Sequence, residues 1–225
     1  MKSLTLNITL DGKNIELSEK SVTDMFHHIY YGSRVWEKTY YFGNHILKCP
    51  LDMWIYQEIF HEMKPDYLIE TGTFHGGSAL YYAHLFDLMS NGKVITIDIE
   101  SRPNMPIHDR IEFVTASSSD TKVFDLIKEK VGSDKKVIVV LDSDHSMKHV
   151  YEEMKLWSDI VSLNSYMIVE DSNVNGYPVR PDFGPGPMEA IDKFLSEDNR
   201  FVIDESREKF FMTQNPRGYL KKIRN

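Results

Sequence analysis

The chain has 225 residues, of which 41% are hydrophobic and 27% are charged, so it can bury the core of one α/β domain. Its formal net charge of -8 argues against a nucleic-acid partner, because proteins that bind phosphate backbones usually carry a concentrated basic face. The single cysteine, Cys49, excludes an internal disulfide and a multi-cysteine zinc site. No signal pattern is present, and no apolar run approaches the ~20 residues that span a bilayer, so we expect a cytoplasmic protein without a membrane partner.

Residues 1–50 are expected to form a short N-terminal extension. Polar and apolar residues alternate at its start, and Asp11-Gly12 favours a hairpin turn. The stretch 20–45 is rich in tyrosine, histidine and tryptophan, and its pattern leaves its structure open. A helix is then predicted from Pro50, because proline is favoured in the first helical turn.

Residues 51–225 are predicted to form one α/β domain. Its pattern alternates short apolar strands, expected over 67–70, 94–99, 111–115, 136–142 and 166–170, with helices, expected over 78–88, 122–130 and 147–161. The run Val-Ile-Val-Val-Leu in the fourth of these strands is typical of a strand buried on both faces. Such alternation predicts a parallel sheet with helices on both faces.

The last stretch of the chain departs from this alternation. After a helix expected over 188–195, the segments 201–204 and 210–213 are separated only by a charged turn, so we expect an antiparallel pair at one sheet edge. The basic tail of Lys221, Lys222 and Arg224 is expected to be a solvated strand end rather than a binding patch.

A glycine-rich loop follows the first strand of the domain, over residues 70–78. Ligands of parallel sheets bind at the carboxyl ends of the strands, and glycines there let the backbone approach a ligand at the start of a helix. The candidate cofactor residues are Glu70, Gly72, Gly76 and Ser78. The Glu-x-Gly spacing, followed by paired glycines, resembles the first motif of S-adenosylmethionine enzymes. A plain glycine-rich turn is the alternative.

Two further strand ends carry candidate cofactor residues. Asp98 closes the next strand, where an acid often accepts hydrogen bonds from the ribose hydroxyls of an adenosine group. Nicotinamide enzymes use the same device, so Asp98 alone indicates only a ribose. Ser117 and Ser118 follow the third strand and are candidates for the adenine ring, or else part of a helix cap.

Carboxylates cluster after the fourth and fifth strands. Bare carboxylates that converge would repel one another, and a hard divalent cation such as Mg²⁺ relieves this repulsion. The expected ligands are Asp144, Glu170 and Asp171. Asp142 is the competing first ligand, or a contact for the ammonium group of the cofactor. A metal at this place would hold a substrate hydroxyl and lower its pKa.

His145 and His149 follow the fourth strand at the spacing of one helical turn. Either is a candidate catalytic base for a hydroxyl proton, and His145 is preferred because it adjoins the carboxylates. The same pair could instead belong to an iron site of two histidines and one carboxylate.

The segment 172–187 contains four prolines and three glycines and leaves the fifth strand beside the proposed metal. Long loops in small domains are usually lids or binding loops, although a passive connector is the alternative. Its candidate substrate contacts are Tyr177, Arg180 and Phe183.

Several segments together resemble the cephalosporin hydroxylase/rhamnosyl O-methyltransferase family of class I methyltransferases. The similarity extends from about residue 35 to the C-terminus. The matching segments are Leu-Lys-Cys-Pro-Leu-Asp-Met-Trp (47–54), the glycine loop (70–78), Leu-Asp-Ser-Asp-His-Ser (141–146), Val-Glu-Asp-Ser-Asn-Val-Asn-Gly (169–176), Gly-Pro-Gly-Pro-Met-Glu-Ala (184–190), Ser-Arg-Glu-Lys-Phe (206–210) and Asn-Pro-Arg-Gly-Tyr-Leu (215–220).

The resemblance implies a Rossmann-like, seven-stranded sheet with an antiparallel last strand, S-adenosylmethionine in the glycine loop, and Mg²⁺ on Asp144, Glu170 and Asp171. Metal-dependent methyltransferases of the catechol type would favour Asp142 as first ligand and have a lysine at the position of His145. The resemblance also implies a homo-oligomer with contacts from the N-terminal segment, which could alternatively cover the active site.

The leading functional interpretation is therefore Mg²⁺-dependent transfer of a methyl group to a hydroxyl of a small-molecule acceptor, such as a sugar, a catechol or a natural-product alcohol. A metal-dependent oxygenase is the runner-up, as the family label suggests. The third interpretation is a non-catalytic protein that keeps only the fold.

Overall fold

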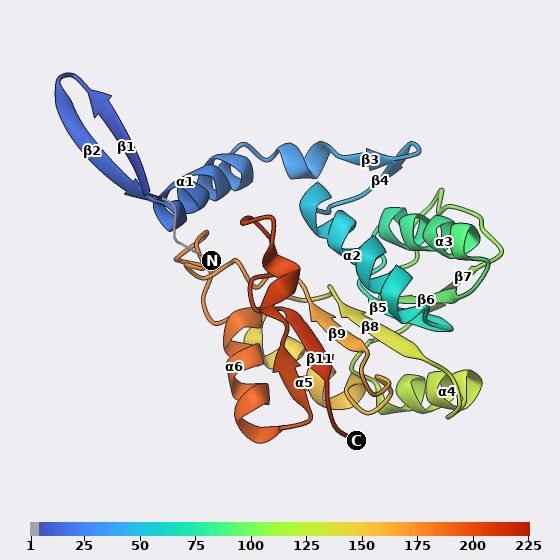
Figure 1. Ribbon diagram of the computed structural model, residues 1–225. Helices are drawn as coiled ribbons and strands as arrows, with labels where there is room; N and C mark the ends of the chain where they lie inside the picture. Colours follow the sequence, from blue (N-terminus) through green and yellow to red (C-terminus); the bar gives the residue numbers. More distant parts are fainter. Residues whose placement is uncertain (1–4) are drawn as a thin grey trace.

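A seven-stranded sheet forms the centre of the computed structural model, which describes residues 5–225 (Figure 1). The strand order is β10-β11-β9-β8-β5-β6-β7, and β11 runs antiparallel to both of its neighbours. The predicted mostly parallel sheet with an antiparallel last strand is confirmed. Its strands are β5 (Tyr67–Thr71), β6 (Lys93–Asp98), β7 (Ile111–Thr115), β8 (Val137–Leu141), β9 (Tyr166–Val169), β10 (Phe201–Ile203) and β11 (Tyr219–Lys222).

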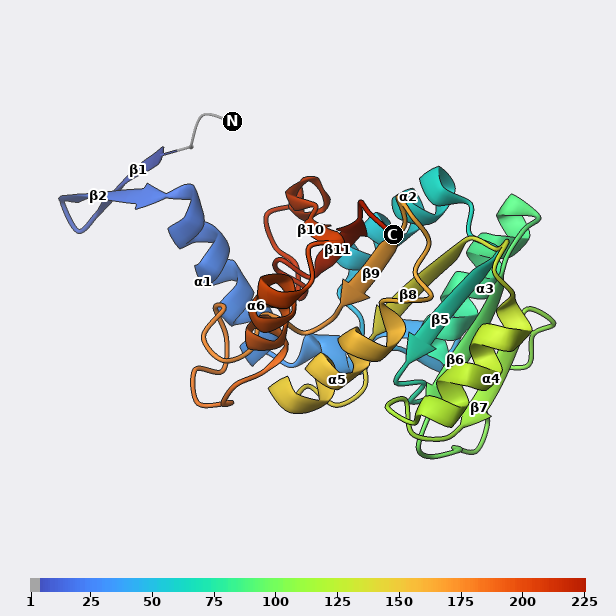
Figure 2. The same ribbon diagram turned by 90° about the horizontal axis from the view of Figure 1, so that it is seen from below.

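Helices cover both faces of the sheet (Figures 1 and 2). One face packs against α2 (Pro50–Met63) and α3 (Gly77–Met89), and the other against α4 (Thr121–Val131), α5 (Met147–Trp157) and α6 (Pro187–Glu197). Strand β8 requires a covering layer on each face, because all five of its residues are buried and apolar and alternate side chains enter the two cores.

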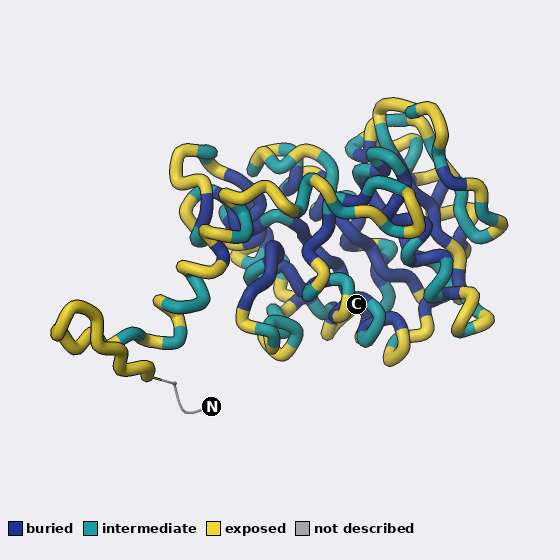
Figure 3. Tube along the Cα trace, turned by 90° about the horizontal axis from the view of Figure 1, so that it is seen from above, coloured by how far each residue is buried: buried dark blue, intermediate teal, exposed yellow. Residues whose placement is uncertain are grey.

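The N-terminal extension begins with a hairpin of β1 (Thr5–Leu10) and β2 (Lys13–Ser18). Asp11 and Gly12 both have positive φ values, as the predicted hairpin turn requires. Residues 1–4 of the expected hairpin lie outside the described part of the chain. The hairpin projects from the body and is exposed along its length (Figure 3).

The aromatic-rich stretch whose pattern left its structure open contains one helix and a small hairpin. Helix α1 (Glu19–Gly32) is capped by the side chain of Ser18. A 3₁₀ turn, η1 (Val35–Lys38), and the short strands β3 (Tyr40–Tyr41) and β4 (Asn44–His45) lead to α2. No helix in the described range 5–225 is both long enough and apolar enough to cross a membrane.

The prediction for the edge pair was wrong. Strand β10 pairs with β11, and residues 210–213 do not form a strand. Phe211 has a φ of 68°, which an extended strand does not allow, and Thr213 Oγ1 donates to Asp52 Oδ1 over 2.5 Å. The segment therefore satisfies its polar groups through α2, and a 3₁₀ turn, η2 (Glu205–Glu208), precedes it.

The tail is only partly solvated, contrary to expectation. Lys222 is buried, and its Nζ donates to the carbonyl oxygens of Ser158 and Val161, each at 2.9 Å. Burial lowers the pKa of Lys222. The helix predicted to reach residue 161 ends earlier, at Trp157, because Ser158 already begins the turn that receives this lysine.

Candidate active site

A cavity of about 780 Å³ opens at the carboxyl ends of the parallel strands. This volume lies within the range of about 300–1,000 Å³ that is usual for small-molecule sites. Residues from five strand ends and from the N-terminal extension surround it, among them Tyr31, Trp36, Lys48, Gly72, Ser78, Asp98, Ser118, Asp142, Asp144, His145, His149, Asp171, Arg180 and Phe183. Most of the predicted site residues therefore face one space.

The glycine loop is packed against the neighbouring strand end. Gly72 has a φ of +87°, and a Cβ built on it would lie 1.8 Å from the carbonyl oxygen of Asp142. Only glycine fits such a position, where the backbone is left-handed and another backbone is in contact. Gly76 caps α3, and Ser78 in its first turn lines the cavity. The first residues of α3, Gly77 and Ser78, line the cavity, and the N–H groups at a helix start have no partner within the helix.

Glu70 lies beneath the loop rather than at the cavity wall. Its side chain is fully buried, and its Oε2 accepts a hydrogen bond from Thr96 Oγ1 over 2.7 Å. The Oε1 atom has no hydrogen-bond partner among the described residues. Burial raises the pKa of Glu70 to about 7, against an opposing effect of Lys48. Glu70 thus supports the glycine loop from the protein interior and does not line the cavity.

Asp98 reaches the cavity from the end of β6. Its Oδ2 accepts from the backbone N–H of Phe74 over 2.9 Å, and its Oδ1 accepts from that of Glu100 over 3.1 Å. These bonds hold the carboxylate beside the glycine loop. Of the two predicted serines, Ser118 lines the cavity, whereas the Ser117 hydroxyl lies 3.0 Å from that of Ser119 outside the lining.

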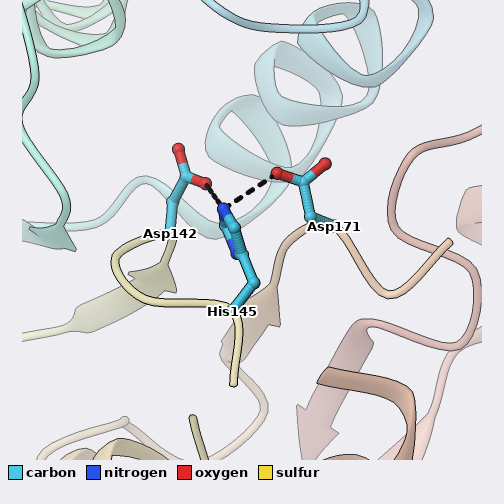
Figure 4. Close-up of side chains that lie close together, drawn as sticks. All are labelled: Asp142, His145 and Asp171. Carbon is cyan, nitrogen blue, oxygen red and sulfur yellow. Dashed lines mark ion pairs between the residues drawn. The ribbon is translucent and has the colours of Figure 1, made fainter. Parts of the chain in front are cut away.

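At the centre of the site lies a cluster of two carboxylates and one imidazole, from Asp142, Asp171 and His145 (Figure 4). We call this cluster the acidic group. One potential ligand atom from each of them lies within 4.8 Å of the others. His145 Nε2 lies 3.2 Å from Asp171 Oδ2 and 4.0 Å from Asp142 Oδ1. The group joins the turn after β8 to the end of β9.

Two of the three predicted metal ligands have other partners. Asp144 Oδ1 accepts from the backbone N–H of Ser146 over 2.7 Å at the start of α5. Glu170 is buried, and its Oε1 accepts from Lys48 Nζ over 2.6 Å and from Tyr56 over 2.7 Å. Asp142 also has another partner, because it pairs with Lys48. Among the described residues, the ligand atoms that converge are nevertheless those of Asp142, His145 and Asp171.

Lys48 is the main site residue that the sequence reasoning missed. Its side chain is 4% exposed, and its ammonium group pairs with Glu170 and with Asp142. Two signals were available: its position between the apolar Leu47 and Cys49, where a lysine needs a buried partner, and its place in the segment 47–54 that resembles the family. The N-terminal extension thus supplies the positively charged side chain that pairs with the carboxylates of Asp142 and Glu170.

The pKa values of this group reflect burial and close charges. Burial raises the pKa of Glu170 to about 6, with Asp142 raising it further and Lys48 lowering it. Burial likewise raises the pKa values of Asp142 and Asp171. For His145, burial lowers the pKa, but Asp171 and Asp142 raise it more, so the net shift is upward.

His149 belongs to a different cluster. Its Nε2 lies 3.4 Å from Oε1 of the buried Glu153 and 3.3 Å from the Ser118 hydroxyl. The Glu153 contact raises the pKa of His149. The described residues therefore do not bring both histidines to one carboxylate, as the iron interpretation requires.

The predicted lid contributes two of its three candidate residues to the cavity. Arg180 and Phe183 line it, and the Arg180 guanidinium lies 5.0 Å from the centre of the Phe183 ring. Tyr177 is 41% exposed and lies outside the lining. The N-terminal extension contributes Tyr31 and Trp36 to the lining, and the rings of these two residues stack at 5.2 Å.

The donor set fits the two groups that the resemblance implies. The carboxylates of Asp142 and Asp171 offer the oxygen ligands that a hard divalent cation such as Mg²⁺ prefers, and no cysteine is among the described residues that line the cavity. The glycine loop, which lines the cavity at Gly72, and the carboxylate of Asp98 suit the amino-acid and ribose parts of S-adenosylmethionine.

Comparison with known proteins identifies the family. The family model described as rhamnosyl O-methyltransferase/CmcI matches residues 33–223. The chain belongs to this family. Among curated relatives, the rhamnosyl O-methyltransferase of Mycobacterium tuberculosis (strain ATCC 25618 / H37Rv) is 43% identical over 212 residues, covering 91% of this chain and 86% of that protein. That of Mycobacterium leprae (strain TN) is 40% identical over 198 residues, covering 85% and 86%.

Solved structures confirm the expected class I methyltransferase fold for this member of the rhamnosyl O-methyltransferase/CmcI family. The apo structure of CmcI-N160 has a TM-score of 0.67 at 23% identity, covering 84% of this chain and 78% of that one. The Mg-SAM structure of cmcI-D160 has a TM-score of 0.64 at 21% identity, with the same coverage. The family match includes the acidic site, whereas the β1–β2 hairpin precedes it.

Proposed function

We propose that this protein transfers the methyl group of S-adenosylmethionine to a hydroxyl of a small molecule with the help of Mg²⁺. The observation that carries the proposal is that the glycine loop, Asp98 and the acidic group line one cavity in a member of an O-methyltransferase family. The printed names of the curated relatives favour a rhamnosyl group as the acceptor.

Residues in different parts of the cavity have different proposed roles. We assign the amino-acid part of the cofactor to the loop at Gly72, its ribose to Asp98, and its adenine to the wall at Ser118. Asp142 and Asp171, which face the cavity, are the proposed metal ligands. When bound, S-adenosylmethionine would supply the methyl group and Mg²⁺ would hold and acidify the acceptor hydroxyl.

His145 is the proposed base. Its Nε2 lies 3.2 Å from Oδ2 of Asp171, one of the proposed metal ligands, and therefore beside the place where Mg²⁺ would hold the acceptor hydroxyl. His145 would therefore accept and hold the hydroxyl proton. His149, held by Glu153 on the adenine side, is assigned to positioning rather than to proton transfer.

The walls contributed by the lid and the extension would bind the acceptor. Arg180 offers hydrogen-bond donors, and Trp36 and Phe183 offer flat apolar rings, a combination that suits a sugar with both polar edges and C–H faces. Together these two segments would also exclude water from the methyl transfer.

The test is direct detection of S-adenosylhomocysteine. The full-length protein is incubated with S-adenosylmethionine, Mg²⁺ and p-nitrophenyl rhamnoside, and both products are followed by mass spectrometry. We expect equal amounts of demethylated cofactor and O-methylated acceptor, at least about 100-fold less product with Asp171→Asn, and loss of product with EDTA. Unchanged turnover in Asp171→Asn would remove the acidic group from the proposal.

We also propose self-association through the N-terminal extension. Leu6, Ile8 and Leu10 are exposed on the hairpin, and Phe26 and Ile29 are exposed on α1. A two-stranded hairpin is at best marginally stable without a partner, so a second copy of this chain is the proposed cover. Light scattering should give a dimer or larger assembly for the wild type and a smaller species for Ile8→Lys.

A cytoplasmic location completes the proposal. The one cysteine, Cys49, is buried as a free thiol, so the fold requires no oxidising compartment. Fractionation of the native host, with detection of the untagged protein by antibody, tests the location. Recovery from the membrane or secreted fraction would contradict it.

A further inference from the structure

Asp171 has an unusual backbone conformation for a residue at the end of a strand. Its φ is 53°, in the left-handed region that non-glycine residues adopt only when their surroundings impose it. This conformation turns the chain directly after Glu170 and brings the Asp171 carboxylate to His145 (Figure 4). A neighbouring group must therefore stabilise the turn.

Hydrogen bonds connect the side-chain amide of Asn215 to Asp171 directly and to Glu170 through one intervening side chain. Its Oδ1 accepts a hydrogen bond from the backbone N–H of Asp171 over 3.1 Å. Its Nδ2 donates to the hydroxyl of Tyr56 over 3.1 Å. That hydroxyl in turn donates to Glu170 Oε1 over 2.7 Å. One amide thus fixes the Asp171 backbone directly and the Glu170 carboxylate through Tyr56.

Asn215 is itself rigidly held. Its side chain is 1% exposed, and its backbone N–H donates to Thr213 Oγ1 over 2.9 Å. Asp52 anchors the same segment, because it accepts from Thr213 and from the backbone N–H of Gln214. Since Asp52 lies in the first turn of α2, the C-terminal segment is tied to the helix that also carries Tyr56.

We propose that Asn215 is a positioning residue for the two proposed metal ligands. It acts on Asp171 through the backbone N–H of that residue, and on Asp142 through Tyr56 and Glu170, because Lys48 pairs with both Glu170 and Asp142. The inference rests on the proposed function, since it assumes that Asp142 and Asp171 bind a divalent cation. Residues that orient ligands in this way typically change metal affinity by 10–100-fold when removed. Neither Asn215 nor Tyr56 lines the cavity, so neither is expected to touch the substrate.

The experiment measures Mn²⁺ binding to the folded full-length protein by electron paramagnetic resonance of the free ion. We expect Asn215→Ala and Tyr56→Phe each to weaken Mn²⁺ binding by about 10-fold or more. Because the two side chains share a hydrogen bond, the double variant should lose less affinity than the product of the two single losses. Near-ultraviolet circular dichroism establishes that each variant is folded at the temperature of the titration.

Tyr82→Phe is the matched control. Tyr82 is equally buried and packs edge-on against Tyr56 at 5.8 Å, but its hydroxyl has no hydrogen-bond partner among the described residues. It should bind Mn²⁺ as the wild type does. Wild-type affinity in folded Tyr56→Phe and Asn215→Ala would overturn the inference alone. Absence of Mn²⁺ binding in the wild type would overturn the proposed metal site and the inference together.

Discussion

Lys48 Nζ lies 2.6 Å from Glu170 Oε1, and both side chains are buried although 122 positions separate them in the sequence. The pair joins the N-terminal extension to the end of β9. Because both charged groups are buried away from water, each needs the opposite charge of the other to offset the free-energy cost of its burial. The same ammonium group also pairs with Asp142, so one lysine organises the acidic side of the cavity.

Replacing this lysine should therefore destabilise the fold. We expect Lys48→Met to lower the free energy of unfolding by about 3–5 kcal/mol, because it leaves Glu170 buried without its cation. Urea denaturation measures the change. The control is Lys209→Met, which breaks an ion pair with Glu58 at the surface and should cost no more than about 1 kcal/mol. Equal effects of the two substitutions would contradict the role of burial.

Gly72→Ala should disrupt the cofactor loop. Its Cβ would meet the carbonyl oxygen of Asp142 at 1.8 Å, so two strand ends would have to separate. Gly43→Ala is the matched control, because Gly43 also has a positive φ but has open space around it. We expect Gly43→Ala to cost about 1–2 kcal/mol from backbone strain alone. Gly72→Ala should lose considerably more stability, together with measurable S-adenosylmethionine binding by calorimetry.

Asp98→Ala should weaken cofactor binding. Loss of hydrogen bonds from ribose hydroxyls to a charged group corresponds to about 1.5–3 kcal/mol, or roughly 10–150-fold in the dissociation constant. Asp120→Ala is the control, since Asp120 also follows a strand but caps α4 through the backbone N–H of Lys122. It should lower stability by about 1 kcal/mol without changing cofactor affinity in calorimetry. Equal affinity in both variants would remove Asp98 from the ribose site.

His27 should make stability depend on pH. Its ring lies 2.9 Å from the Asn173 amide, and burial lowers its pKa from 6.5 to about 4. A histidine whose pKa is lower in the folded state stabilises the fold above pH 6.5, and this contribution is lost as the pH falls from 6.5 to about 4. His27→Gln should flatten this part of the curve. His61→Gln, at an exposed position near the end of α2, should leave its slope as in the wild type.

Much of the fold could be predicted because local pattern and tertiary structure agree. The five-residue apolar run of β8 needs two covered faces, and the helices that supply them follow from the alternation of the chain. The edge pairing was mispredicted because residues 210–213 look like a strand but bind Asp52 instead. A hydrogen bond to a distant helix leaves no periodic signal in the sequence.

The candidate site was predictable where residues follow parallel strands, since those ends share one edge of the sheet. Asp142 and Asp171 were found in this way, and the structure places them in one group with His145. Lys48 and Asn215 were not predicted as site residues, because Lys48 precedes and Asn215 follows the region in which strands and helices alternate. Their contacts depend on how the two ends of the chain pack, which residue spacing does not reveal.

The central claim is that cofactor and metal meet in one cavity, and nuclear magnetic resonance of S-adenosylmethionine labelled with ¹³C in its methyl group tests it most directly. With the protein present, replacement of Mg²⁺ by paramagnetic Mn²⁺ should strongly broaden the methyl resonance, and Asp171→Asn should abolish that broadening. A cofactor that binds with an unaffected methyl resonance while Mn²⁺ is bound would contradict the claim.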